Sequence, residues 1–420
     1  MAFAIGVLLL IPVGLSYAEL TACMPVAGGP IMHSYKAFGS FFAFLTGWAY
    51  VLGYIPICVW ESVSLGAIIG WIIPEMSTMP LYSIGNYIIY LPQLLVGLIA
   101  TVFFTIINVL GIKLSSKFQT IVTMALFIIG FSFVIAAIVY GNIDNMQPLL
   151  TEGSFVEVAG KIIRVLTTFV IFLVCGFETV PQQAEERSSE MEPKNFWVPL
   201  ILAIVSASTF YISIIVATSM IVPWRSLLDS ELPVFDAIRV AFKSPTFVYL
   251  ITACALAGLL TTFNGLFIAG SRILLALARE QLIPNTFVKI HPRHRTPYIS
   301  IIAIGLITFV GTFFGKSIWL PLVNLTAFGF AMAWFFETTV ALKLRFSEPN
   351  LCRPYKMYGG KVTATIGAIL CALIIILLLL PGSSAQIVWP TEYLILATWL
   401  AIGIIFYYYS RKILKKKITQ

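Results

Sequence analysis

Charge is what this 420-residue sequence has least of. Asp, Glu, Lys and Arg together make up 10% of the residues, while hydrophobic residues make up 59%. A water-soluble domain cannot cover that much apolar surface with so few charges, so the composition excludes a soluble globular protein. We therefore expect a polytopic membrane protein that has the lipid bilayer as a partner.

Residues that bind metals or act as nucleophiles are also scarce. The six cysteines are scattered without CxxC spacing, which argues against a disulfide framework or a metal site. The three histidines and three aspartates all fall in predicted loops, so the membrane-depth Asp pair or HExxH helix of an intramembrane protease is missing. We expect no enzyme activity, no metal and no cofactor.

Long apolar segments dominate the rest of the chain. About 20 apolar residues, at 1.5 Å rise each, are needed to cross a hydrocarbon core of roughly 30 Å. Eleven segments meet this requirement, which predicts an all-α polytopic membrane protein. They lie near residues 2–22, 41–70, 86–111, 118–140, 161–181, 196–222, 246–275, 298–314, 318–342, 362–380 and 391–409.

The basic residues are distributed unevenly between the loops. Twenty of the 26 Lys and Arg residues fall in loops on one side of the predicted spans, and six fall on the other. Lys and Arg concentrate in cytoplasmic loops, so this asymmetry predicts a plasma (inner) membrane protein with a cytoplasmic carboxyl terminus. The net charge of +8 has the same origin. It favours contact with anionic lipid, and we expect no nucleic-acid partner.

One predicted span, residues 161–181, carries polar and helix-breaking residues at membrane depth. Cys175-Gly176-Phe177-Glu178 is followed by Pro181, which has no backbone N–H to donate. A buried carboxylate beside a glycine predicts a discontinuous helix, whose free carbonyls and amides suit a ligand with both an ammonium and a carboxylate group. The alternative is a Gly/Pro kink in which Glu178 has only a structural hydrogen bond.

Three further carboxylates lie in predicted spans. Glu61 would favour a cationic or polyamine substrate by charge pairing, or else it faces water in an outer vestibule. We expect Glu19 to hold down a loop at the cytoplasmic end. For Glu337 we expect a pair or a snorkelling contact with Lys343 or Arg345.

Several motifs occur in a fixed order along nearly the whole chain. They are Ser16–Leu20 with Pro25 and Gly28-Gly29, Ala37–Gly39 with Gly47-Trp48, Phe172–Glu178 with Ala184–Glu186 and Pro193, Asn264 with Ser271-Arg272, and Arg353–Tyr355. Together they resemble the amino acid, polyamine and organocation (APC) transporter superfamily.

The resemblance implies a leucine-transporter-like fold, in which two inverted five-helix repeats hold the substrate between the broken first and sixth of twelve helices. Residues 1–420 are then one transmembrane transporter domain, with residues 1–140 the remainder of the first repeat, 161–342 the second, and 362–410 two accessory helices. The first span matches the family's second, so we expect about eleven spans, without the broken first helix that receives the substrate carboxylate in relatives.

The resemblance also implies roles for particular residues. It assigns substrate binding to Phe172, Cys175, Gly176 and Phe177, with Phe172 stacking on the substrate and the other three forming unwound backbone. Glu178 becomes the candidate coupling carboxylate, and Glu61 is a second candidate for coupling or gating. A hydroxyl pair, Thr261 and Thr262, suggests a sodium site only weakly, because such hydroxyls usually bond their own helix.

These inferences predict a secondary active transporter that moves amino acids or related amines by alternating access, as a symporter or exchanger. Its partner is a small-molecule substrate; the coupling ion, the direction of transport and the oligomeric state stay open. Two alternatives are kept. A truncated, non-transporting sensor or subunit is suggested by the missing helix, and a polyamine or organocation exchanger is suggested by Glu61.

Overall fold

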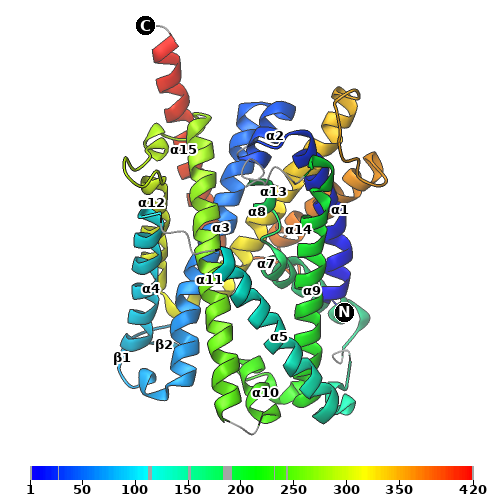
Figure 1. The fold of residues 1–420 in the computed structure, drawn as a ribbon, viewed down its shortest axis with the longest axis vertical. Helices are drawn as coiled ribbons and strands as arrows, with labels where there is room; N and C mark the ends of the chain where they lie inside the picture. Colours follow the sequence, from blue (N-terminus) through cyan, green and yellow to red (C-terminus); the bar gives the residue numbers. More distant parts are fainter. Residues whose placement is uncertain are drawn as a thin grey trace.

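The computed structural model describes residues 2–26, 28–111, 116–149, 153–182, 192–230, 232–242 and 245–418. Long helices run side by side along the longest axis of the molecule (Figure 1). Their bounds are α1 Ala2–Cys23, α2 Gly29–Phe38, α3 Ser40–Ile72, α4 Leu91–Val109, α5 Ser116–Tyr140, α6 Phe155–Val165, α7 Ile171–Val174, α8 Thr179–Gln182, α9 Trp197–Ile221, α10 Pro233–Ala241, α11 Pro245–Arg279, α12 Tyr298–Thr312, α13 Trp319–Ser347, α14 Lys361–Leu379 and α15 Thr391–Ile418.

Shorter elements join these helices. A π-helical turn, η3 (Leu166–Val170), connects α6 to α7. The 3₁₀ turns are Pro74–Ser77, Ile143–Met146, Pro193–Asn195, Trp224–Leu227, Asn285–Val288 and Gly315–Ile318, and the strands are β1 Pro80–Ile84 and β2 Tyr87–Tyr90.

Within the described residues, ten helices are long and apolar enough to cross a membrane. They correspond to ten of the eleven predicted segments. The remaining segment, predicted at 298–314, forms the 15-residue apolar helix α12, which is shorter than a full span. The expected polytopic all-α architecture is confirmed, with one short hairpin as its exception.

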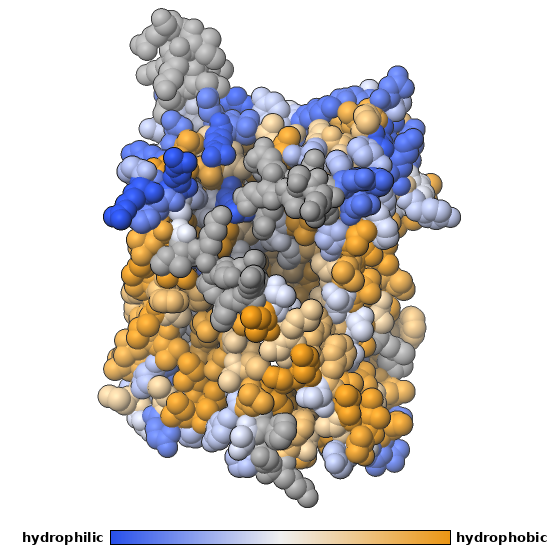
Figure 2. All heavy atoms as spheres, viewed as in Figure 1, coloured by the Kyte–Doolittle hydropathy of each residue, from blue (hydrophilic) through white to orange (hydrophobic). Residues whose placement is uncertain are grey.

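The surface agrees with a membrane setting. Figure 2 shows apolar side chains around the middle of the molecule and hydrophilic ones at its two ends, most densely at the end where Figure 1 places α2. Large apolar side chains on α5 and α9 are exposed, as in Ile128 at 69% and Leu202 at 63%. Exposing such a surface to water costs free energy, whereas contact with lipid tails does not.

Helix α3 is the central element of the core and packs against α13, α11, α4 and α2. Its crossing with α13 is made by glycines: a Cβ placed on Gly329 would lie only 2.6 Å from the backbone nitrogen of Gly53. Small residues allow two membrane helices to approach this closely. The crossing therefore fixes the positions of the side chains that α3 and α13 direct toward the site.

The hairpin changes the predicted start of the third span. Residues 87–90 (Tyr-Ile-Ile-Tyr) form β2, which pairs antiparallel with β1, and α4 begins only at Leu91. Aromatic and β-branched residues favour a strand, and Pro92 is suited to the first turn of a helix. The turn glycine Gly85 has φ +57°, a conformation that glycine adopts without strain.

Candidate functional site at the break between α7 and α8

The chain leaves the helix after Val174 and resumes it at Thr179. Cys175 has ψ 161° and Gly176 has φ +117°, a backbone conformation that favours glycine. A Cβ placed on Gly176 would meet no atom within 4 Å, so this part of the backbone borders open space. The sequence Cys175-Gly176-Phe177-Glu178 therefore forms an unwound turn inside a membrane helix.

Unwinding leaves backbone groups without helical partners. In the described part of the chain, the carbonyl oxygens of Leu173, Val174 and Cys175 accept no hydrogen bond. The Gly176 N–H turns away from the helix and donates to both carboxylate oxygens of Glu178, at 2.9 Å each. The first half of the break thus presents acceptors, as expected at the carboxyl end of a half-helix.

Glu178 is fully buried beside this turn. The hydroxyl of Tyr54 on α3 donates to its Oε1 at 3.5 Å, and Gln182 Nε2 donates to the same hydroxyl at 2.7 Å. The carboxylate therefore braces the unwound backbone and also connects it to α3. This arrangement includes the structural hydrogen bonding of the alternative interpretation, but within a broken helix instead of a kinked one.

Aromatic rings flank the break on both sides. Phe172 is 7% exposed and meets Trp60 edge-on, with ring centroids 5.2 Å apart. Trp60 in turn lies 6.0 Å from Trp319. Beyond the break, Phe177 packs against Trp334 at 5.3 Å. The unwound turn is enclosed between two groups of rings contributed by α3, α7 and α13.

Glu61 lies near the same turn. It is 4% exposed, so it does not face open water, and its Oε2 has no hydrogen-bond partner among the described residues. Cys175 is within electrostatic range of both Glu61 and Glu178. Five of the six predicted site residues, Phe172, Cys175, Gly176, Phe177 and Glu178, thus lie on one segment. The sixth, Glu61, lies on α3 next to Trp60, whose ring meets Phe172.

Glu19 has the kind of role expected for it. Its carboxylate accepts from Arg345 Nε at 2.9 Å and from the Met357 N–H at 2.8 Å, and it forms an ion pair with Arg353 Nε at 3.4 Å. These contacts tie α1 to α13 and to the loop after it.

The expectation for Glu337 was wrong. Its Oε1 contacts His33 Nδ1 at 2.6 Å, and both side chains are fully buried. Arg345 is eight residues further along the helix, a rise of about 12 Å, and Lys343 six residues along points to a different face. A short helix, α2, folds back against α13 and supplies the nearer partner instead.

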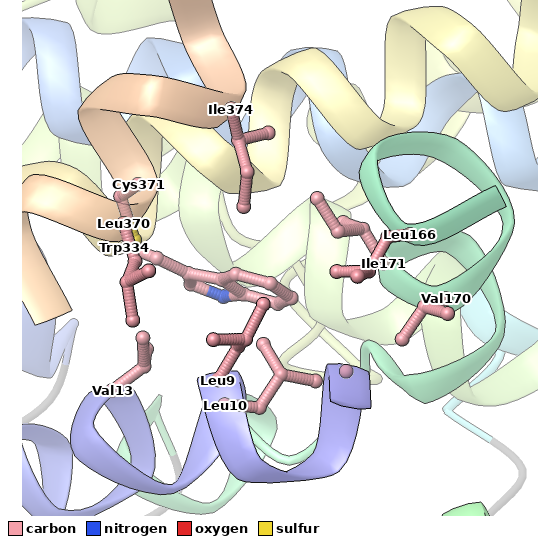
Figure 3. A pocket seen from close by; sticks show the side chains of 11 residues that line it. Leu9, Leu10, Val13, Leu166, Val170, Ile171, Trp334, Leu370, Cys371 and Ile374 are labelled. Atoms are coloured by element: carbon pink, nitrogen blue, oxygen red, sulfur yellow. The ribbon is translucent and has the colours of Figure 1, made fainter. Parts of the chain in front are cut away.

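A small apolar pocket lies beside the first half of the break. Figure 3 shows side chains from α1, η3, α7, α13 and α14 around it, with the indole of Trp334 between them. No charged side chain lines the pocket. Among the described residues, Trp334 Nε1 has no hydrogen-bond partner.

Sequence reasoning missed the tyrosines that connect the site to the rest of the core. Tyr50 and Tyr54 stack on each other, and Tyr50 and Tyr17 share a short hydroxyl hydrogen bond. The i, i+4 spacing of Tyr50 and Tyr54 on one helix face was the available signal. The motif residues Ala184–Glu186 lie outside the described residues.

Comparison with known proteins identifies the family. Residues 1–407 match the family described as "Amino acid permease". The chain belongs to this family. It is 26% identical over 411 residues to a methylthioribose transporter of Bacillus subtilis (strain 168), covering 94% of this chain and 82% of that protein. A branched-chain amino acid permease of the same organism is 24% identical, with 98% and 85% covered.

Another relative is a vacuolar cationic amino acid transporter of Arabidopsis thaliana, 27% identical over 80% of this chain and 55% of its own length. The permease family confirms the predicted APC membership and the polytopic membrane class. The protein is thus a multi-pass integral membrane permease, and its family consists of transporters and not enzymes.

Proposed function

We propose that this permease binds an amino acid at the break between α7 and α8 and carries it across the membrane by alternating access. The observation that carries the proposal is the unwound turn, where the carbonyls of Leu173, Val174 and Cys175 accept no hydrogen bond from the described residues and Gly176 borders open space. Free carbonyls at membrane depth are costly unless they line a binding cavity. An ammonium group is the ligand they suit best.

Two side chains at the turn have separate proposed roles, one in contacting the substrate and one in holding the unwound backbone. Phe172 would cover the substrate from the side of Trp60, giving an aromatic contact of roughly 1 kcal/mol beyond burial. Glu178 would hold the Gly176 amide and set the shape of the turn, so that substrate binding and the α3 contact through Tyr54 change together. We infer substrate-binding and coupling roles from this geometry.

The substrate class follows from the family and from one side chain. Relatives are named for branched-chain amino acids, cationic amino acids and methylthioribose. Oε2 of Glu61, which has no hydrogen-bond partner among the described residues, would pair with a positive group near the turn. Among amino acids it therefore favours a cationic side chain. It also supports the second candidate function, exchange of a polyamine or other organic cation.

The order of the helices supports the proposed repeats. Helices α1 to α5 and α9 to α13 follow the same pattern, in which a short helix, α2 or α10, comes after the first span and before the longest one. Figure 1 places α2 and α10 at opposite ends of the molecule, as inversion requires. The counterparts α1 and α9, α3 and α11, and α4 and α12 pack against each other. Residues 1–140 and 161–342 would thus be inverted halves, with 362–410 accessory.

We further propose that the end holding α2 faces the cytoplasm of a plasma membrane. Figure 2 places the densest hydrophilic surface at that end, in agreement with the uneven distribution of Lys and Arg. Labelling of single cysteines, placed at Lys36 and at Glu75 near opposite ends of α3, by an impermeant reagent tests this orientation. If the cysteine at position 75 is labelled from the cytoplasm, the proposed orientation is wrong and the end holding α2 faces outward.

Counterflow in liposomes tests the transport proposal. Liposomes that contain the purified full chain are loaded with unlabelled substrate. Uptake of radiolabelled L-leucine, L-arginine and methylthioribose is then measured at equal pH on both sides of the membrane. We expect saturable exchange of an L-amino acid with little exchange of its D-isomer. A folded protein that exchanges none of the L-amino acids, or does not distinguish isomers, contradicts the proposal.

Site variants test the assigned residues. We expect Phe172→Ala and Glu178→Ala to abolish most exchange, whereas the lipid-facing Phe103→Ala and the exposed Glu75→Ala leave it unchanged. Glu61→Gln separates the substrate classes. If the Glu61 carboxylate recognises a cation, L-arginine exchange falls by roughly tenfold or more, as for loss of a charge-assisted contact, and L-leucine exchange does not.

A further inference from the structure

A second buried titratable site lies away from the break. His33 on α2 and Glu337 on α13 form a pair with 2.6 Å between Nδ1 and Oε1, and neither side chain is exposed. Nothing in the proposed substrate site uses this pair. His33 lies on α2, which Figure 1 places at one end of the molecule.

The hydrogen bonds determine how many protons the pair holds. His33 Nε2 lies 3.1 Å from the Met24 carbonyl, which can only accept, so Nε2 carries a hydrogen. At 2.6 Å, Nδ1 and Oε1 must share one proton, because two bare acceptors would repel each other. The pair is therefore neutral overall, as imidazolium with carboxylate or as imidazole with carboxylic acid.

The remaining carboxylate oxygen is where a second proton would bind. Glu337 Oε2 is buried and has no hydrogen-bond partner among the described residues. A free acceptor on a fully buried carboxylate is costly in a membrane, and such groups in transporters line proton or ion pathways. Protonation of Oε2 would convert the neutral pair to an imidazolium beside a carboxylic acid, with a net charge of +1.

Phenols connect this pair with the substrate site. Tyr17 and Tyr50 share a hydroxyl hydrogen bond, and both are within electrostatic range of Glu337 and of Glu178. Tyr50 stacks on Tyr54, whose hydroxyl donates to Glu178. Tyr17 and Tyr50 are therefore the groups through which a change of charge at Glu337 would act on the carboxylate that braces the broken helix.

The pair also lies across a mechanical junction. It joins α2 to α13, and the first turn of α2 rests on α8, where a Cβ on Gly29 would lie 3.0 Å from the Pro181 carbonyl oxygen. Movement of the second half of the broken helix toward α2 would therefore displace α2. Helix α2 thus contacts both the second half of the broken helix and the helix that carries Glu337.

Other titratable groups near the pair are already engaged or uncharged. Tyr17 on α1 and Tyr50 on α3 face it, the described part of α8 has no titratable side chain, and Cys371 is the buried thiol of α14. Glu19 and Arg345 are paired with each other. At the exposed edge of α2 lie Tyr35, Lys36 and its partner Glu348.

We propose that the His33–Glu337 pair is a proton-binding site that couples substrate movement to a proton gradient. The proposal rests on the transport function proposed above. In each cycle one proton enters from one side of the membrane and forms an O–H bond at Glu337 Oε2. That bond breaks and the proton leaves to the other side when the site reopens there, which restores the neutral pair.

Uptake driven by a pH gradient tests the proposal. Liposomes containing the full chain, with the membrane potential clamped by potassium and valinomycin, receive L-leucine or L-arginine with acid on one side. We expect accumulation above equilibrium for the wild type. For Glu337→Gln and His33→Gln we expect accumulation to be lost while counterflow at equal pH persists. The matched control Glu348→Gln removes an exposed carboxylate near the same end and should accumulate substrate normally.

The outcomes separate the two proposals. Counterflow without gradient-driven accumulation in the wild type overturns the proton site and leaves the transport proposal standing. Equal loss of counterflow and accumulation in both variants reduces the pair to a structural clamp. Where Glu337→Gln does not fold, Tyr50→Phe is the substitute, because it removes one hydroxyl but keeps the ring packing. We expect Tyr50→Phe to reduce gradient-driven accumulation more than it reduces counterflow at equal pH.

Infrared titration tests proton binding without transport. We expect acidification of the purified protein to add a carbonyl band of a buried carboxylic acid that is missing in Glu337→Gln and present in Glu348→Gln. Identical spectra for the wild type and Glu337→Gln, over the whole pH range in which both are folded, refute the site even if no substrate is found.

Discussion

The glycine crossing of α3 and α13 gives the sharpest stability prediction. In Gly329→Ala the new Cβ would lie 2.6 Å from Gly53 N, 2.9 Å from Ala49 O and 2.9 Å from Leu52 C. All three are backbone atoms within a helix and cannot rotate away. The two helices must therefore separate, and α3 and α13 carry Tyr54 and Trp334 to the site.

The magnitude follows from two opposing terms. Overpacking of a close helix crossing costs about 1–3 kcal/mol, and a clash with backbone belongs at the upper end of that range. The higher helix propensity of alanine offsets roughly 1 kcal/mol of this cost. We therefore expect a net loss of about 1–2 kcal/mol and a melting temperature lowered by a few degrees.

Two further glycines complete the series. The three atoms nearest to a Cβ on Gly53 would be ring atoms of Phe330, at 2.9 to 3.1 Å, and a Cβ on Gly265 in α11 would meet nothing within 4 Å. Melting of the detergent-solubilised protein, followed by size-exclusion chromatography, should rank Gly329→Ala as least stable, then Gly53→Ala, then Gly265→Ala. A Gly329→Ala variant as stable as Gly265→Ala would refute the close crossing.

Three other predictions concern polar contacts. Glu19→Gln leaves the partly buried Arg345 without its anion, and we expect a lower yield of folded protein that Arg345→Ala partly restores. The Asn108–Asn264 contact at 2.9 Å joins α4 to α11, and a double-mutant cycle to alanine should give a coupling of about 0.6–1.7 kcal/mol by thermal melting. Burial raises the pKa of Tyr82, whose hydroxyl donates to the Phe313 carbonyl. Its contribution to hairpin stability should be complete below the ordinary tyrosine pKa of about 10, lost as the pH rises through the raised pKa, and missing from Tyr82→Phe in melting curves.

Features encoded within one short segment were predictable from the sequence. The spans follow from runs of apolar residues, and the break follows from Gly176, Glu178 and Pro181 lying within six residues of one another. The unwound turn uses these residues directly, because glycine adopts the required φ and the carboxylate bonds the amide two residues before it. Local chemistry was enough to locate the candidate site.

Contacts between distant segments were not predictable in this way. His33 and Glu337 are 304 positions apart, and the 10-residue helix that carries His33 is too short and too polar to be recognised as a membrane element. The expectation for Glu337 considered only cations on its own helix. In a bundle, the partner of a buried carboxylate comes from whichever helix packs on that face, and this depends on the fold as a whole.

The polar groups of this core fall into two kinds. Thr261 and Thr262 both donate to the Gly258 carbonyl of their own helix, at 2.8 and 3.0 Å, which satisfies the hydroxyls locally. Hydroxyls can rotate toward such a partner, whereas a carboxylate needs donors brought to it. Within the described residues, the only buried carboxylate oxygens left without one are Oε2 of Glu61, beside the break, and Oε2 of Glu337, beside α2. Unpaired acceptors in a membrane cost several kcal/mol each. A positively charged ligand would therefore gain the most binding free energy by contacting these two oxygens. A substrate cation at the first and a proton at the second are therefore the two binding events that this fold leaves open.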